Sequence, residues 1–368
     1  MNFHFTEEQA AVRDLAIQII GDASTPEKLR EIEKSGGPRF DRGLWASLAE
    51  AGLLGISLPE SAGGAGLGLI EAGCVIRAAA FNAAAVPVWE TLGLGAPAIA
   101  EFAPADVAAD WLGRVAGGTA VLTAAWHEEL GDPLDPQIIA TATAGGDAWT
   151  VSGTKVCVPA GSIADAAVVP ARSASGPVLL LVDLAASGVT RTDQLTTAAT
   201  PEAQLDFADT PALLLAEGDE ALGWAFDRAV ATQCTAALGT AEAALALTAE
   251  YTKERKQFDV PIASFQAVGH RAADTFIDTE TIRLTAWHAL WRLSMGLPAH
   301  EEVAVAKFWA AFSGHRISLA SAHLHGGVGV DRDYPLHRHF IAAKQHELQL
   351  GGATQSLLRL GREIAANA

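Results

Sequence analysis

The feature that most constrains the fold is a change of hydrophobic period in the middle of the chain. Residues 1–116 read as amphipathic helices, and Thr6 with Gln9 forms a capping-box pattern that predicts a helix start. Residues 117–215 hold short apolar or alternating runs, such as PVLLLVDL, which turn signals separate. From residue 216 the helical period returns. The sequence therefore predicts a mainly α protein with a small antiparallel β domain between an N-terminal helical domain (1–116) and a C-terminal one (216–368).

The composition is typical of a protein in a reducing compartment. Half of its 368 residues are hydrophobic, which is enough for a sizeable core spread over two or three domains or layers. No apolar run reaches the length that spans a bilayer, and the N-terminus has no apolar signal core. Three scattered cysteines (Cys74, Cys157 and Cys234) have no metal-like spacing. We expect a cytoplasmic protein.

The charge balance limits the possible partners. The formal net charge is −18, which argues against nucleic acid or an anionic membrane surface as a partner. Any ligand that carries phosphate must therefore be held by a few local basic groups, against the field of the whole protein.

Several familiar site patterns are absent. The run GGAGLG at 63–68 does not fit Gly-x-Gly-x-x-Gly and follows no clear strand, so it does not indicate a dinucleotide fold. His323 and His325, or His337 and His339, lie near no cysteine or carboxylate cluster. We expect these histidines in the core or at an interface, and we expect no metal site. The nucleophile pattern Gly-x-Ser-x-Gly is also absent.

The segment ERKQFDVPIASFQ has the features of a ligand-binding corner. A long helix ends near Arg255, Pro261 enforces a break, and Ser264 is a candidate cap for the next helix. An arginine at such a corner can place its planar guanidinium on a pyrophosphate. The alternative is an ion pair with Glu254 or another surface carboxylate, and the residues alone do not decide between the two.

A second segment, SAHLHGGVGVDRDYPLHRHFIAAK, breaks a helix sharply with Gly326, Gly327 and Gly329. Glycines in this position allow another backbone, or a flat ligand, to approach closely. A helix C-cap is the simpler interpretation, but three glycines in four residues exceed what a cap needs.

Together these segments resemble the acyl-CoA dehydrogenase family over nearly the whole chain. LPESAGGAGLG, YTKERKQFDVPIASFQ and HLHGGVGVDRDYPLHRHFIAAK are similar to three of its motifs, and the last two are long and specific. The resemblance implies an N-terminal helical domain, a β-barrel-like middle domain, a C-terminal four-helix bundle and a tetramer. It also implies FAD, an acyl-CoA substrate that is desaturated between Cα and Cβ, and an electron-transfer flavoprotein as the electron acceptor.

The family's general base has no counterpart in this chain. A glutamate takes the α-proton in the family, because that proton is too weakly acidic to leave unaided. The position that matches the usual glutamate is Leu350, in KQHELQLGGATQ, and the second known base position matches Ala229. Neither side chain can accept a proton, so we expect no catalytic residue at either place.

The resemblance separates two sets of flavin contacts. In the β domain the threonines that hold the flavin ring are missing, and Pro159 cannot donate a backbone hydrogen bond. The chain is therefore not expected to seat a flavin ring in its own β domain. The residues that in the family reach the neighbouring subunit's FAD are kept, apart from a histidine that replaces glutamine at 323: Arg255, Phe258, Gln266, His323, Gly326 and Gly327.

This pattern is similar to the non-catalytic β-type subunits of actinobacterial α2β2 steroid-CoA dehydrogenases. The resemblance implies a catalytic partner subunit that supplies the base and the flavin pocket, with Arg255 on the FAD pyrophosphate and Gln266 on the adenosine half. One alternative is a self-sufficient homotetramer whose base has moved, for example to Asp227 or Glu347. Another is a scaffold of the same fold that has lost the cofactor.

Overall fold

The computed structural model describes residues 4–142 and 148–366. The chain divides into two compact units, each assembled from separate stretches of sequence. Unit 1 comprises residues 1–29, 73–84 and 230–368, and unit 2 comprises 30–72 and 85–229. The expected three-part division at 116 and 215 stays a prediction.

The N-terminal part is helical, as predicted. The capping box at Thr6 is present, because its hydroxyl accepts from the Gln9 N–H and the Gln9 side chain accepts from the Thr6 N–H. The helices are α1 (Glu7–Ala23), α2 (Pro26–Lys34), α3 (Arg42–Glu50), α4 (Leu69–Phe81), α5 (Ala96–Phe102) and α6 (Ala105–Ala116), with a 3₁₀ turn η1 (Glu60–Ala62) and a π-helical turn η2 (Glu90–Gly95).

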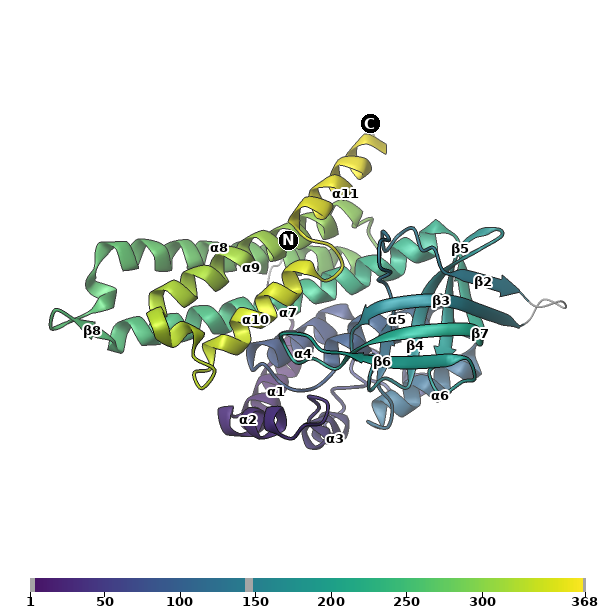
Figure 1. Ribbon diagram of the computed structural model, residues 1–368, viewed down its shortest axis with the longest axis horizontal. Helices are drawn as coiled ribbons and strands as arrows, with labels where there is room; N and C mark the ends of the chain where they lie inside the picture. Colours follow the sequence, from purple (N-terminus) through teal and green to yellow (C-terminus); the bar gives the residue numbers. More distant parts are fainter. Residues whose placement is uncertain (1–3, 143–147, 367–368) are drawn as a thin grey trace. The chain divides into compact units, whose positions relative to one another are not determined.

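The middle strands close on themselves in unit 2 (Figure 1). Antiparallel pairing links β2 to β3, β3 to β7, β7 to β5 and β5 to β4, while β2 meets β4 again in parallel. This ring of pairings is the predicted barrel-like domain, but β1 also pairs with β4 in parallel, so the domain is not purely antiparallel. The strands are β1 (Leu122–Ala124), β2 (Ile139–Ala142), β3 (Trp149–Val158), β4 (Ala166–Ser173), β5 (Gly176–Asp183), β6 (Val189–Gln194) and β7 (Glu202–Glu217).

The C-terminal part of unit 1 is the expected four-helix bundle of α7, α8, α9 and α10, followed by α11 (Figure 1). Their inward faces are rich in alanine, which allows close packing. No helix within the described residues is both long and apolar enough to cross a membrane. The elements are α7 (Asp219–Glu254), β8 (Lys256–Gln257), β9 (Val260–Pro261), η3 (Ile262–Ser264), α8 (Gln266–Ser294), α9 (His300–His325), η4 (Gly326–Val330), α10 (Leu336–Leu348) and α11 (Ala353–Ala366).

Candidate functional site

A small hairpin projects from the end of the helical bundle, where α7 gives way to β8 and β9 (Figure 1). The hairpin is closed by the Ile262 N–H, which donates to the Arg255 carbonyl at 2.8 Å. The two residues at its tip, Phe258 (φ 54°) and Asp259 (φ 64°), both have left-handed backbones. That combination belongs to a type I′ turn, which usually selects Asn and Gly because a larger side chain is strained there.

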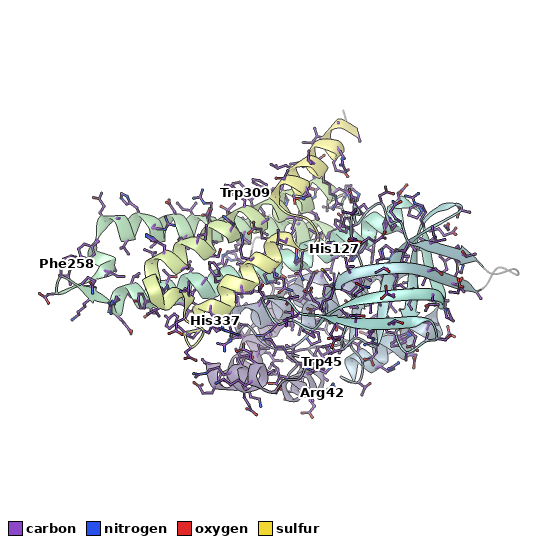
Figure 2. All side chains as sticks on the ribbon, in the orientation of Figure 1. Arg42, Trp45, His127, Phe258, Trp309 and His337 are labelled. Carbon is purple, nitrogen blue, oxygen red and sulfur yellow. The ribbon has the colours of Figure 1, made fainter. Side chains whose placement is uncertain are left out.

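The hairpin side chains face away from the chain. Phe258 is 89% exposed (Figure 2), and its ring meets that of Phe265 in a T-shaped arrangement with 6.2 Å between the centroids. Arg255 is exposed, and its guanidinium forms no ion pair or hydrogen bond with any residue that the structure describes. The ion pair with Glu254 that we considered is therefore not formed within the described chain.

Gln266 is the first residue of α8 and is exposed. The expected cap from Ser264 is wrong, because that serine lies in the preceding 3₁₀ turn and donates its hydroxyl to the Pro261 carbonyl. Phe265 stands at the N-cap without a capping side chain. The first turn of α8 thus begins with uncapped N–H groups next to the hairpin that carries Arg255.

The glycine turn follows directly on α9, where His323 is exposed. Gly326 ends the helix with φ 61°, and a side chain there would be strained. Gly329 packs tightly, since a Cβ atom would lie 2.6 Å from the Ala322 carbonyl oxygen. Neither backbone strain nor tight packing requires a glycine at 327, because no described atom lies within 4 Å of its would-be Cβ. The C-cap interpretation therefore explains Gly326 and leaves Gly327 open to a ligand or another chain.

Leu350, at the position where the resemblance places the family's usual base, lies in a tight turn. Leu350 is buried and has φ 56°, a conformation that costs a non-glycine residue roughly 1–2 kcal/mol. The turn is held through its backbone: the Gln233 amide donates to the Gln349 carbonyl at 3.3 Å, and Lys307 Nζ donates to the His346 carbonyl at 2.6 Å. Burial lowers the pKa of Lys307 to about 8.

The second base position lies in unit 2 and is filled by packing. Ala229 is buried, and its carbonyl accepts from the Trp89 indole at 3.3 Å. Asp227, the nearby alternative, is also buried. Sequence reasoning missed Glu90, whose pKa is raised to about 7 by burial, with the charge of Glu202 adding to the effect. It opens the π-helical turn η2, an irregularity that hydrophobic periodicity does not reveal.

The other alternative base, Glu347, is already engaged. Its carboxylate contacts Lys344 Nζ and lies 3.1 Å from His315 Nδ1. These two groups compete with any other proton donor for the same oxygen, which makes Glu347 a poor base for a carbon acid.

The β domain offers little to a flavin ring. The Cys157 N–H donates to the Gln194 side chain at 2.7 Å, Pro159 has no N–H, and the Gly161 N–H donates to the Val158 carbonyl. Thr123 uses its hydroxyl on the Pro159 carbonyl. The N–H groups of Cys157 and Gly161 are thus occupied within the chain, and Pro159 has none.

Comparison with known proteins identifies the family. Residues 6–119 match the model of the acyl-CoA dehydrogenase N-terminal domain, and residues 217–364 match that of the C-terminal domain, so that together the matches cover more than half of the chain. The chain belongs to the acyl-CoA dehydrogenase family. Acyl-CoA dehydrogenase FadE27 of Mycobacterium tuberculosis is 39% identical over 99% of both chains, and FadE28 of the same organism is 33% identical over 98% of both.

Solved acyl-CoA dehydrogenases share the whole fold. A variant of the Tcur3481–Tcur3483 steroid ACAD is 41% identical, with a TM-score of 0.93 over 98% of each chain. The ChsE4–ChsE5 complex from Mycobacterium tuberculosis is 39% identical, with a TM-score of 0.93 over 99% of each chain. Within this acyl-CoA dehydrogenase fold, unit 1 of our chain carries all six predicted cofactor-binding residues and the Leu350 turn.

Proposed function

We propose that this chain is the non-catalytic subunit of a heteromeric, FAD-dependent acyl-CoA dehydrogenase that desaturates a steroid side-chain CoA thioester between Cα and Cβ. A catalytic subunit of the same family supplies the general base and the pocket for the flavin ring. This chain contributes the hairpin and the glycine turn to the FAD held by that partner.

The proposal depends on one observation: Leu350 stands in the turn where the family's base is expected, which we call the base turn. The turn is built as a catalytic turn would be, with a strained backbone fixed by Gln233 and Lys307, yet its side chain is aliphatic. Proton abstraction from a thioester needs a positioned carboxylate. Since Ala229 is equally inert and Glu347 is engaged by its neighbours, a base from another subunit is the simplest source of activity.

The proposed contact with the partner's FAD is supported by the exposed hairpin between α7 and α8 (residues 255–266) and by the glycine turn (326–330), which together we call the arm. FAD, when bound, supplies the acceptor for the hydride that leaves Cβ. Arg255 extends a guanidinium that pairs with no described residue, and such a group can bind a pyrophosphate with two parallel hydrogen bonds. Phe258 offers an apolar surface, Gln266 offers amide groups for the adenosine half, and Gly327 leaves room for close approach. The chain's charge of −18 makes such local cations necessary for any phosphate ligand.

The substrate class and the partnership come from the relatives. The Tcur3481–Tcur3483 protein is a steroid ACAD, and ChsE4–ChsE5 is a complex of two named components. At about 40% identity over almost the whole chain, we extend both properties to this protein. The rival proposal of a self-sufficient enzyme is weakened by the engaged Glu347 and by the occupied donors around Pro159.

The test compares two preparations. One is this chain purified alone, and the other is the complex that a tag on this chain recovers from the protein's own host. We expect the chain alone to lack stoichiometric FAD and to leave a steroid side-chain CoA unoxidised. The complex should be yellow and active. A yellow, active homomer would refute the proposal.

A pair of variants then tests the arm. Arg255→Ala should weaken FAD retention in the complex by about 1.5–3 kcal/mol, the range for a hydrogen bond to a charged group. Arg42→Ala is the matched control, because Arg42 is exposed on α3 and contacts the ring of Phe40 (Figure 2). Equal FAD retention in both variants would reduce Arg255 to an ordinary surface residue.

A further inference from the structure

Three aromatic side chains lie against one another behind the glycine turn. His325, the last residue of α9, stacks on Tyr251 of α7 with ring centroids 4.4 Å apart and an interplanar angle of 25°. Its ring also contacts Tyr334, which precedes α10, at 5.2 Å. The two tyrosines meet edge to face at 6.3 Å. All three belong to unit 1.

The hydrogen bonds of His325 fix its tautomer. Nδ1 lies 2.8 Å from the Ser321 carbonyl oxygen, which can only accept, so Nδ1 carries the proton. Nε2 lies 3.2 Å from the Tyr334 hydroxyl, and in the neutral ring it accepts from that hydroxyl. Burial lowers the pKa of His325, which favours this neutral form.

These contacts span the glycine turn from one side to the other. Ser321 lies before Gly326, and Tyr334 lies after the turn ends at Val330, so one imidazole ring links both flanks. Gly329 packs tightly against Ala322, but the outer part of the turn is loosely packed, because Val330 is 69% exposed and the would-be Cβ atoms of Gly326 and Gly327 face open space among the described residues. The link made by the ring therefore adds to the few contacts that hold this outer part in position.

The same ring reaches the hairpin. Tyr251 lies one turn of α7 before Arg255, and its carbonyl accepts the Arg255 N–H at 2.8 Å. Stacking on Tyr251 thus connects the end of α7 to the end of α9 through His325. The buried ring of His325 thus contacts residues next to both segments that have cofactor-binding features.

We propose that His325 is a positioning residue, whose ring holds the glycine turn in register with Arg255 so that both meet the same nucleotide. It acts through Tyr251 and Tyr334 and does not itself touch the cofactor. This inference rests on the proposed FAD contacts of the arm. The simpler alternative is that His325 is an aromatic core residue whose hydrogen bonds merely satisfy its nitrogens.

The test compares FAD dissociation from the recovered complex across four variants. Tyr334→Phe removes only the hydroxyl and should raise the dissociation constant for FAD about fivefold, the worth of one hydrogen bond. His325→Leu removes both hydrogen bonds and the stacking, and should raise it tenfold or more. His288→Leu is the control, because His288 is exposed on α8 and stacks only on Trp291 among the described residues. Arg255→Ala reports on the proposed function itself.

A second readout needs no cofactor. In the NMR spectrum of the full chain, the imidazole of His325 should be the Nδ1–H tautomer. Its pKa should rise in Tyr334→Phe, because the hydroxyl no longer favours the neutral ring. A purely structural His325 would lower the melting temperature in His325→Leu without changing FAD dissociation from the folded complex, and that result would overturn the inference. If Arg255→Ala also leaves FAD dissociation unchanged, the proposed function fails as well.

Discussion

The buried Lys307 allows a quantitative test of how the base turn is held. Lys307 is 2% exposed, and its ammonium donates to the His346 carbonyl, one of the last carbonyls of α10, where the negative end of the helix dipole favours a cation. Burial still dominates, because it lowers the pKa of Lys307 from 10.5 to about 8. A shift of this size corresponds to roughly 3 kcal/mol, at about 1.4 kcal/mol for each pKa unit.

The sign of the pH dependence follows from the direction of this shift. Between pH 8 and 10.5 the unfolded chain still holds the lysine proton while the folded chain has lost it. The contribution of Lys307 to stability therefore rises with pH through this window. Lys307→Met removes this contribution, so we compare the free energies of unfolding of the wild type and the variant. Their difference, wild type minus variant, should increase by about 2–3 kcal/mol between pH 7 and pH 10.

The assay is urea denaturation of both proteins at several pH values, followed by tryptophan fluorescence. Taking the difference cancels the other groups that titrate in this range. Lys253→Met is the control, because Lys253 is 64% exposed and pairs only with Glu250 among the described residues, so its difference curve should be flat. A flat curve for Lys307→Met would refute the reasoning that a desolvated charge sits under the base turn.

Three further predictions concern buried groups. Burial and the charge of Lys307 lower the pKa of His346 to about 3, so the free energy of unfolding of the wild type should fall on acidification below pH 6.5. Between pH 7 and pH 5, His346→Asn should lose about 2 kcal/mol less of this free energy than the wild type, as measured by urea denaturation. Leu350→Glu should leave the isolated chain inactive, and acyl-CoA oxidation by that variant would contradict the eroded flavin pocket. Glu128→Gln should destabilise the β domain by about 3–5 kcal/mol in thermal unfolding, because it leaves the fully buried Lys155 without its 2.7 Å ion pair; an effect no larger than that of Glu129→Gln would contradict this.

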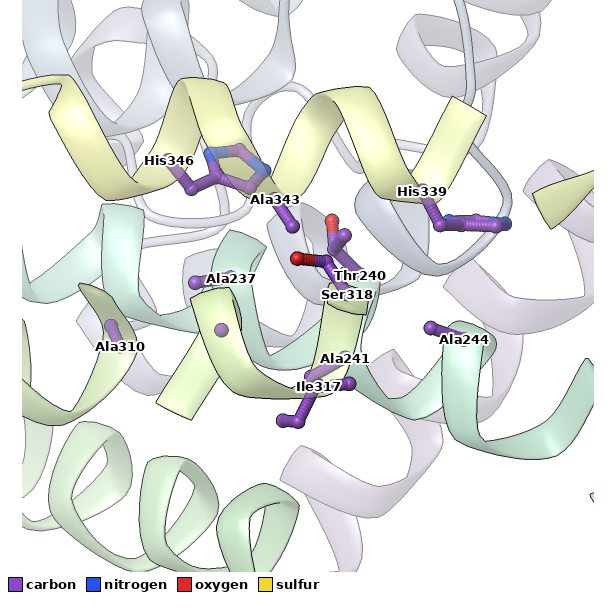
Figure 3. A pocket seen from close by; sticks show the side chains of 11 residues that line it. Ala237, Thr240, Ala241, Ala244, Ala310, Ile317, Ser318, His339, Ala343 and His346 are labelled. Carbon is purple, nitrogen blue, oxygen red and sulfur yellow. The ribbon is translucent and has the colours of Figure 1, made fainter. Parts of the chain in front are cut away.

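The His346 prediction depends on where that ring lies. His346 projects from α10 toward α7 and α9, where it lines a cavity of about 10 Å³ together with Thr240 and Ser318 (Figure 3). Its Nδ1 atom is buried and has no hydrogen-bond partner among the described residues. A proton added there would be desolvated and close to the Lys307 charge, which explains the direction of the shift.

Local patterns predicted the parts of the fold that local physics determines. The capping box at Thr6 sets the start of α1, and apolar alternation marks the strands of the middle domain. The parallel pairing of β1 with β4 could not be predicted in this way, because the partners of Leu122–Ala124 lie more than forty residues away. Ser264 was misassigned for a local reason: it lies in a 3₁₀ turn after Pro261, and its hydroxyl donates back to the Pro261 carbonyl.

In the candidate site, too, the sequence predicted the locally marked residues and not those that depend on distant contacts. Arg255 and the glycines were found because an unusual local sequence marks them. The contribution of His325 was hidden, because it arises from Tyr251, far away in the chain, and from Tyr334 across a turn. Lys307 was hidden too, since nothing in EEVAVAKFWAAF shows that its ammonium reaches the end of another helix.

Backbone strain is compensated differently at the Leu350 turn and at the tip of the hairpin. At Leu350 a left-handed backbone is stabilised from within, by donors from Gln233 and Lys307 to the adjoining carbonyls. At Phe258 and Asp259 two consecutive left-handed residues occur at the tip of an exposed hairpin, where the Phe258 ring meets the ring of Phe265. Strained backbone persists only where its surroundings compensate for it. At the hairpin the compensation within the chain is backbone pairing alone, between β8 and β9 and from the Ile262 N–H to the Arg255 carbonyl. In the function proposed above, contact of the exposed tip with the partner's cofactor would add to it.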